Sequence, residues 1–142
     1  MISLFLDTCT SHLLLGIYKD KKQILWKDEE VHNDLSSKTL PLIKNSLDEL
    51  GISITDLDEI YVVNGPGSFT GIRVGVTIAK TIAWALNIKI YSVSELELLA
   101  TTKVDTNYII PMIDARRGYV YGGIYDKDGN SIVNDQYIEK NE

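Results

Sequence analysis

The sequence is poor in the residues that build disulfide frameworks and metal centres. Its 142 residues include one cysteine, Cys9, and two histidines, His12 and His32. A single cysteine excludes an internal disulfide and a cysteine-rich metal site, and it fits a protein of a reducing compartment. Neither histidine has a cysteine or a second histidine at the spacing of zinc ligands, and no serine nucleophile elbow lies nearby. The residues therefore predict no metal site, and they indicate no catalytic residue.

Basic charge and long apolar runs are also scarce. The 14 Lys and Arg residues are outnumbered by 20 Asp and Glu residues, so the formal net charge is −6. This balance argues against a protein that holds nucleic acid by itself, because such binding rests mainly on phosphate neutralisation. No apolar run approaches the roughly 18 residues needed to span a membrane, and the segment Met1–Asp7 lacks the basic region of a signal peptide. We expect a cytoplasmic protein with no membrane partner.

What the sequence does contain is enough apolar residues for a core. Hydrophobic residues make up 44% and charged residues 24%, as in ordinary globular domains. Short apolar runs between polar turns predict an antiparallel meander of three strands, Ile2–Leu6, Leu13–Tyr18 and Gln23–Val31. Leucine and isoleucine then recur at helical spacing over residues 33–50. Pro41 lies inside this segment, so the regular helix either begins near Lys38 or is kinked at the proline.

The second half of the chain alternates between strand and helix patterns. A capping box at Ser94 and Glu97 opens a short helix that ends near Lys103. The other predicted elements are, in order, a strand over Ile60–Val63, a helix over Ile72–Asn87, and strands over Ile88–Val93, Tyr108–Ile113, Val120–Tyr125 and Ser131–Tyr137. The order βββαβαβα, followed by βββ, predicts an α/β protein with a mixed sheet whose central strands are parallel. Aspartate turns follow buried strands at both Asp7 and Asp114, so the fold unit starts a second time near residue 108.

A glycine-rich turn, Gly65–Gly71, joins a buried strand to the longest helix. It is not a Walker A loop, because Ile72 and Arg73 follow the last glycine instead of Lys and Ser or Thr. It is not a good dinucleotide fingerprint either, because no acidic residue closes the next strand. Three interpretations stay open. The glycines pack the helix start closely on the sheet, they dock a partner's backbone or a ligand, or they form an independent phosphate site.

The helix after this turn is apolar nearly all round, and such a helix needs burial on more than one side. Its narrow polar face carries Arg73, Lys80 and an exposed Trp84, and a tryptophan flanked by cations is typical of an interface anchor. The alternative is that all the apolar positions are satisfied within one domain. We predict a partner interface at Thr70, Arg73, Val74, Thr77, Ile78, Lys80, Thr81 and Trp84.

Polar residues beside buried strands are the other candidates. The Asp7 carboxylate and Thr8 hydroxyl suit a metal-bound nucleotide phosphate, with Gly65 and Gly67 as further candidate cofactor-binding residues. Alternatively, Asp7 and Thr8 satisfy the amides of their own turn. The segment Asp114–Gly118 is interpreted as a salt-bridged turn or a partner contact in preference to a catalytic site, and residues 126–130 as a hairpin tip in preference to a calcium loop.

Three stretches carry a family resemblance. The run Asn64–Gly75 closely resembles the signature of the TsaB (YeaZ) family of bacterial tRNA threonylcarbamoyladenosine biosynthesis proteins, which is related to the TsaD (peptidase M22-like) family. The segments Leu6–Thr10 and Ile113–Gly118 are similar to the starts of that family's two lobes. The resemblance implies an actin-like ATPase (sugar kinase/Hsp70) fold.

The resemblance also implies a role. Family members are regarded as non-catalytic partners of a TsaD-like catalytic subunit, and they work together with a TsaE-like ATPase. They support threonylcarbamoyl transfer onto the adenosine next to the anticodon, so tRNA is a partner only indirectly. The resemblance implies a homodimer through the first two helices when the protein is alone, and pairing with TsaD through the same surface.

The second lobe is short by comparison with this family, in which the two lobes are of similar size. We expect an N-terminal lobe over residues 1–105 and a partial second lobe of strands only over 106–142. A two-lobed nucleotide cleft then cannot close as in relatives, so we expect no tightly bound cofactor and ATP only weakly or at a partner interface. The alternative function is a nucleotide-binding enzyme of the actin-like ATPase class, using Asp7 and the Gly65–Gly71 turn.

Overall fold

The structure is a computed structural model that describes residues 1–141. The chain divides into two compact units, Met1–Val93 and Ser94–Glu142. The boundary predicted after residue 105 lies inside the second unit, because a short helix that begins at Glu95 packs its Leu96 and Ala100 against Tyr125 of that unit. Each unit is built on its own sheet.

The first unit contains a five-stranded mixed sheet with the strand order β3-β2-β1-β4-β5. Strand β1 pairs antiparallel with β2 and parallel with β4, and β4 pairs parallel with β5. The predicted α/β class, with an antiparallel meander leading into parallel central strands, is therefore confirmed. The strands are β1 (Ile2–Asp7), β2 (His12–Lys19), β3 (Lys22–Glu30), β4 (Glu59–Val63) and β5 (Lys89–Val93).

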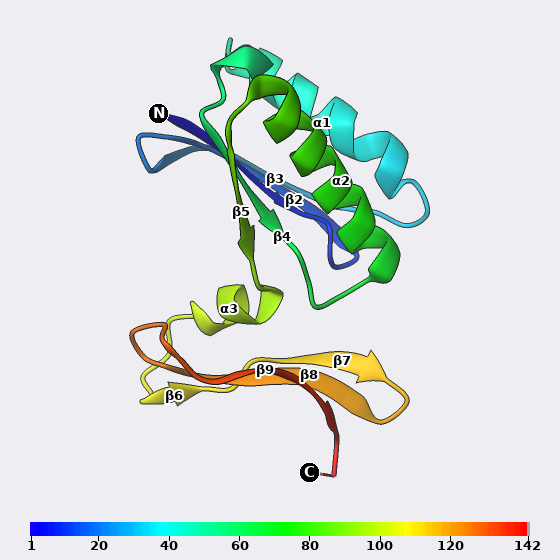
Figure 1. Cartoon of the computed structure of the whole chain (residues 1–142), viewed down its shortest axis with the longest axis vertical. Helices are drawn as coiled ribbons and strands as arrows, with labels where there is room; N and C mark the ends of the chain where they lie inside the picture. Colours follow the sequence, from blue (N-terminus) through cyan, green and yellow to red (C-terminus); the bar gives the residue numbers. More distant parts are fainter. Residues whose placement is uncertain (142) are drawn as a thin grey trace. The chain divides into compact units, whose positions relative to one another are not determined.

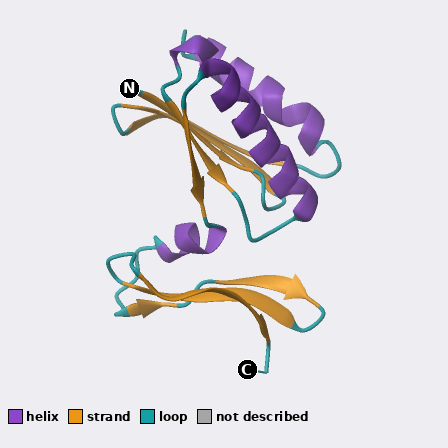
Figure 2. Cartoon of the chain, in the orientation of Figure 1, coloured by secondary structure: helices purple, strands orange, loops and turns teal. Residues whose placement is uncertain are grey.

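Two helices, α1 (Leu35–Glu49) and α2 (Phe69–Leu86), lie side by side on one face of this sheet (Figure 1, Figure 2). Inward-facing strand residues such as Leu4, Leu15 and Ile60 form the core with Ile43 of α1 and Ala79 of α2. Helix α1 runs unbroken from Leu35 through Pro41, so a start near Lys38 is wrong. Pro41 is exposed, on a side of the helix where water can replace the missing backbone donor.

Helix α2 begins three residues before the predicted start, because Ser68 caps it. The Ser68 hydroxyl accepts a hydrogen bond from the Gly71 amide at 3.2 Å. Asn87, predicted as the last helical residue, is the C-cap in the left-handed conformation, with φ of 54°. By length and composition alone, α2 passes the test for a membrane-spanning helix. In the fold, some of its small and apolar residues, such as Ala79 and Ile82, are buried in the first unit, and others lie on the surface described below.

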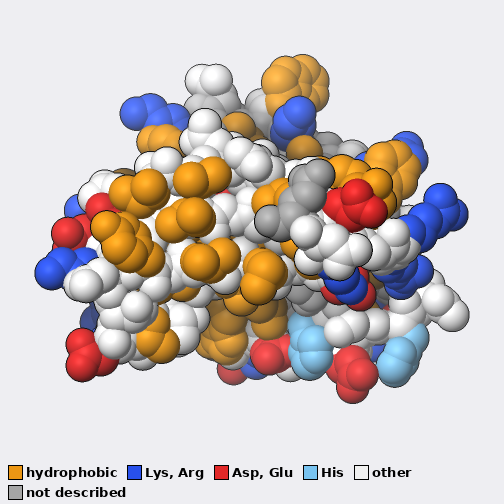
Figure 3. Space-filling view, turned by 90° about the horizontal axis from the view of Figure 1, so that it is seen from below, with side chains coloured by type: hydrophobic (Ala, Val, Ile, Leu, Met, Phe, Trp, Pro, Cys, Tyr) orange, Lys and Arg blue, Asp and Glu red, His pale blue; other side chains and the backbone are white. Residues whose placement is uncertain are grey.

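The second unit consists of helix α3 (Glu95–Ala100) and four strands, β6 (Tyr108–Ile109), β7 (Met112–Arg116), β8 (Tyr119–Asp126) and β9 (Ser131–Glu139). Strand β8 pairs with each of the other three. The single strand predicted over Tyr108–Ile113 is wrong, because the chain breaks into β6 and β7 at Pro111, which has no amide to donate. Hydrophobic side chains gather on the face seen in Figure 3. The most exposed apolar side chains of this unit include Tyr108, Ile110, Met112 and Ile132.

Candidate functional site

The glycine-rich turn packs directly against the residues that follow β1. A Cβ atom at Gly67 would lie 2.5 Å from the Cys9 carbonyl oxygen, and one at Gly71 would overlap the Thr8 carbonyl oxygen. The Ser68 amide donates a hydrogen bond to the Cys9 carbonyl at 2.8 Å. Only glycine permits an approach this close, so the geometry supports the close-packing interpretation of the turn.

The side chains proposed to bind a nucleotide phosphate, Asp7 and Thr8, make hydrogen bonds within the protein. The Thr8 hydroxyl donates to the Gly71 carbonyl at 2.5 Å, and the Asp7 carboxylate accepts from the Cys9 amide at 2.8 Å. Asp7 is 1% exposed and Thr8 is fully buried. Two amides at the helix start, those of Ser68 and Gly71, already donate to the Cys9 carbonyl and the Ser68 hydroxyl. Gly65 (φ 105°) and Gly67 shape the backbone of the same turn.

The predicted partner residues lie on the outer side of α2. Six of the eight are exposed, and Val74 and Ile78 are half-buried. Trp84 is the most exposed, at 86%. The structure adds Phe69 to this set. Its side chain is 74% exposed and lies under the Arg73 guanidinium, whose central carbon is 5.3 Å from the centre of the Phe69 ring. Phe69 was not predicted because the helix was expected to begin at Ile72. Ser68, a residue typical of helix N-caps, was the signal for the earlier start. We call Phe69 and the eight predicted residues the α2 surface.

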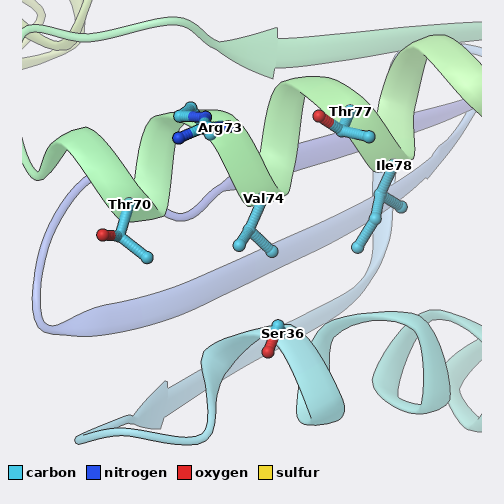
Figure 4. Close-up of a pocket in the computed structure, with 6 residues that line it drawn as sticks. All are labelled: Ser36, Thr70, Arg73, Val74, Thr77 and Ile78. Carbon is cyan, nitrogen blue, oxygen red and sulfur yellow. The ribbon is translucent and has the colours of Figure 1, made fainter.

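A hollow of about 390 Å³ lies between α2 and the first turn of α1. Its lining consists of Ser36 from α1 and Thr70, Arg73, Val74, Thr77 and Ile78 from α2. In Figure 4, Thr70, Val74 and Ile78 point toward the end of α1 that carries Ser36, whereas Arg73 and Thr77 leave α2 on a different side. Sequence periodicity singled out the five α2 residues but not Ser36, because Ser36 joins them only through the packing of α1 beside α2.

The other polar candidates form turns. The amide of Arg116 and the ammonium of Lys140 both donate to the Asp114 carboxylate, at 3.1 and 3.2 Å, and they lower the pKa of Asp114. The Asp126 carboxylate accepts from the amides of Asp128 and Asn130 at the β8–β9 hairpin tip. Within residues 1–141, no group of three or more His, Cys, Asp or Glu side chains is placed to hold a metal ion.

Comparison with solved structures defines the fold class. An exopolyphosphatase from Cytophaga hutchinsonii superimposes with a TM-score of 0.51 and 13% identity, over 98% of this chain and 50% of that chain. At this identity, the likeness concerns the fold alone. The strand order β3-β2-β1-β4-β5, with both crossover helices on one face, is that of an actin-like ATPase lobe. The chain therefore has the actin-like ATPase fold.

Closer relatives define the family. Residues 28–141 match the family model described as TsaD: tRNA N6-adenosine threonylcarbamoyltransferase. The tRNA threonylcarbamoyladenosine biosynthesis protein TsaB of Bacillus subtilis (strain 168) is 37% identical over 97% of this chain and 62% of that protein. YeaZ from Pseudomonas aeruginosa superimposes with a TM-score of 0.84 at 27% identity, over 97% of this chain and 66% of that chain. The chain belongs to the TsaB (YeaZ) family, which is related to TsaD. It spans less than two thirds of the length of these relatives.

Proposed function

We propose that the chain acts in threonylcarbamoylation of the adenosine next to the anticodon in tRNA, as a non-catalytic scaffold. It binds a TsaD-like catalytic subunit, and the pair works with a TsaE-like ATPase. Family membership supports the pathway. The observation that carries the scaffold role is the α2 surface, where an 86% exposed tryptophan and a 74% exposed phenylalanine flank an apolar hollow. Exposed aromatic and arginine side chains around a half-buried apolar centre are the composition of binding hot spots.

The hollow supplies the apolar centre of this interface. Val74 and Ile78 are half-buried, and they line it together with Thr70 and Thr77. Full burial of an exposed aliphatic side chain is worth about 1.5–3 kcal/mol, so completing the burial of a half-buried one is worth roughly 1 kcal/mol. A partner helix laid along α2 at the hollow contacts both side chains and reaches Trp84 toward the C-terminal end of α2. In the absence of the TsaD-like subunit, the same surface serves a homodimer.

The arrangement at the glycine-rich turn supports a non-catalytic role. The Asp7 carboxylate accepts a hydrogen bond from the Cys9 amide, and the Thr8 hydroxyl donates one to the Gly71 carbonyl. Asp7 and Thr8 are both buried. A nucleotide phosphate has to displace these bonds, so ATP binds the chain only weakly or at the interface with a partner. The tRNA is reached through the TsaD-like subunit, and the complex works in the cytoplasm with its tRNA.

Co-purification with a TsaD-like protein tests the scaffold role. We expect Val74→Glu or Ile78→Glu to abolish co-purification, because each places a carboxylate in the apolar hollow. The matched control is Ile132→Glu, a change of the same kind at a 55% exposed position in the second unit. Circular dichroism of each variant verifies the fold. Retention of the partner by both hollow variants, with tRNA modification unchanged, contradicts the proposal.

A further inference from the structure

The charges on α2 are of one sign. Within Phe69–Leu86 the only charged residues are Arg73 and Lys80, and the helix contains no carboxylate. Both side chains are exposed, and within residues 1–141 neither takes part in an ion pair. This is a cationic and apolar surface on a chain whose net charge is −6. Such a local reversal of charge favours an anionic partner.

The two cations lie on one side of α2 at a defined spacing. Arg73, Thr77, Lys80 and Trp84 follow one another at intervals of four, three and four residues, which places them along one stripe. Arg73 and Lys80 are thus two turns apart, or about 10 Å at 1.5 Å per residue. Val74 and Ile78 of the hollow line the adjacent stripe. A single helix laid along α2 can therefore meet both stripes at once.

The Arg73 guanidinium is oriented before any partner arrives. It stacks over the Phe69 ring with 5.3 Å between its central carbon and the ring centre. A stacked guanidinium keeps its planar fork available for a carboxylate, which it binds with two parallel hydrogen bonds. Its immobilisation on binding costs less entropy than that of a free side chain.

Helices α1 and α2 of a second copy offer no unpaired carboxylate to these cations. Helix α2 carries no carboxylate, and each carboxylate at the ends of α1 already has a cation. These ion pairs are Asp34 with Lys38, Asp48 with Lys44, and Glu49 with Lys27, at 3.1, 3.1 and 2.8 Å. Packing of the α2 surface on its own copy brings Arg73 and Lys80 near cations or near carboxylates that are already paired.

We infer that the α2 surface selects a helix of a different chain, one that carries an apolar stripe flanked by two carboxylates about two turns apart. One carboxylate pairs with the stacked Arg73 guanidinium and the other with the Lys80 ammonium, while the apolar stripe fills the hollow. The inference rests on the proposed function and specifies its partner. Arg73 and Lys80 make the α2 surface bind a different chain in preference to a second copy of this one. The hollow contributes affinity for either partner.

Titration of the purified full chain with the purified TsaD-like subunit tests this inference. The variants are the double charge reversal Arg73→Glu/Lys80→Glu and the control Lys21→Glu/Lys22→Glu, which makes the same charge change at the β2–β3 turn. The dissociation constant is measured at low and at high sodium chloride. The loss of two charge-assisted pairs is expected to weaken binding about 100-fold in the first variant. Its salt dependence is expected to reverse, because added salt screens the new repulsion between carboxylates, whereas in the wild type it screens an attraction. The control is expected to bind within about threefold of wild type.

The outcomes separate the inference from the proposed function. Wild-type binding that the Arg73/Lys80 reversal leaves unchanged overturns the inference and leaves the scaffold role standing. Absence of wild-type binding overturns the scaffold role itself. Self-association of each variant is measured by light scattering, and the reversal is expected to leave it within about threefold of wild type, because both copies carry the same change. A self-association that the reversal abolishes, or a binding of free tRNA that depends on these two cations, contradicts the selection of an acidic helix.

Discussion

The Thr8 hydroxyl donates a hydrogen bond to the Gly71 carbonyl oxygen at 2.5 Å and fastens the turn after β1 to the first turn of α2. Both partners are buried, and they lie 63 residues apart in the chain. Gly71 and Gly75 of α2 leave room for Thr8, and Gly67 in the turn before α2 leaves room for Cys9. The glycine-rich turn therefore sets the position of α2 on the sheet, and with it the position of the α2 surface.

Gly71→Ala is expected to destabilise the fold by about 1–3 kcal/mol, because the added methyl group overlaps the Thr8 carbonyl oxygen and forces the backbone to move. The gain in helix propensity, about 1 kcal/mol, offsets only part of this. Urea denaturation measures the change. Gly122→Ala is the control, since its Cβ would meet neighbouring atoms at an ordinary 3.6 Å. Equal stability of the two variants contradicts a close-packing role for the turn.

Ser68→Ala is expected to lower the stability by about 1 kcal/mol, because the Gly71 amide loses its capping acceptor. Ser68→Asp restores most of the loss, since a carboxylate caps the amide and is favoured at a helix N-terminus. Thermal unfolding followed by circular dichroism compares the two variants. If alanine and aspartate behave alike, the hydroxyl does not act as the cap.

Tyr125 is expected to ionise late in an alkaline titration. Burial and the hydrogen bond that its hydroxyl donates to Asp135, at 2.6 Å, raise the pKa of Tyr125 from 10.0 to about 12. Because the folded-state pKa is raised, this group contributes stability that is fully present below pH 10 and is lost as the pH rises toward 12. Absorbance at the tyrosinate band follows the ionisation. Tyr125→Phe should remove the last step, and Asp135→Asn should shift it to lower pH. If all tyrosines of the folded protein ionise together near pH 10, the burial of Tyr125 and its bond to Asp135 do not raise its pKa.

Asp7→Ala is expected to reduce stability and leave nucleotide affinity unchanged. The buried carboxylate accepts from the Cys9 amide, and an amide left without an acceptor costs about 1–3 kcal/mol. Calorimetry with Mg-ATP on the chain alone should show no micromolar binding in the wild type or the variant. Micromolar affinity that disappears in Asp7→Ala would instead support a nucleotide-binding enzyme.

The sequence predicted the strands of the first sheet and their mixed arrangement, because period-two and period-3.6 patterns are strong over whole elements. It also predicted the outer residues of α2, since stripes on a long helix follow from spacing alone. It did not predict Ser36 at the hollow or Phe69 under Arg73. Ser36 belongs to the site through the packing of α1 beside α2, a tertiary contact. Phe69 depended on the helix boundary, which is set by the Ser68 cap.

The boundary between the two units escaped prediction for a similar reason. The polar stretch around residue 105 is typical of a linker, but Ser94 and Tyr125 both donate to the Asp135 carboxylate. The Ser94 bond joins the start of α3 to β9, a contact that local sequence does not reveal, and the Tyr125 bond joins β8 to the same carboxylate. Helix α3 is therefore held in the second unit, and the division falls at Val93.

The mass of the particle formed when this chain is mixed with a TsaD-like subunit decides whether the α2 surface binds that partner. We expect a one-to-one complex by light scattering. Trp84→Ala should leave the chain folded, because the side chain is 86% exposed, and should weaken the complex by about 30-fold or more, as expected for a hot spot worth at least about 2 kcal/mol. Two separate species for the wild-type mixture, or a complex that Trp84→Ala and Val74→Glu leave intact, would contradict partner binding through α2.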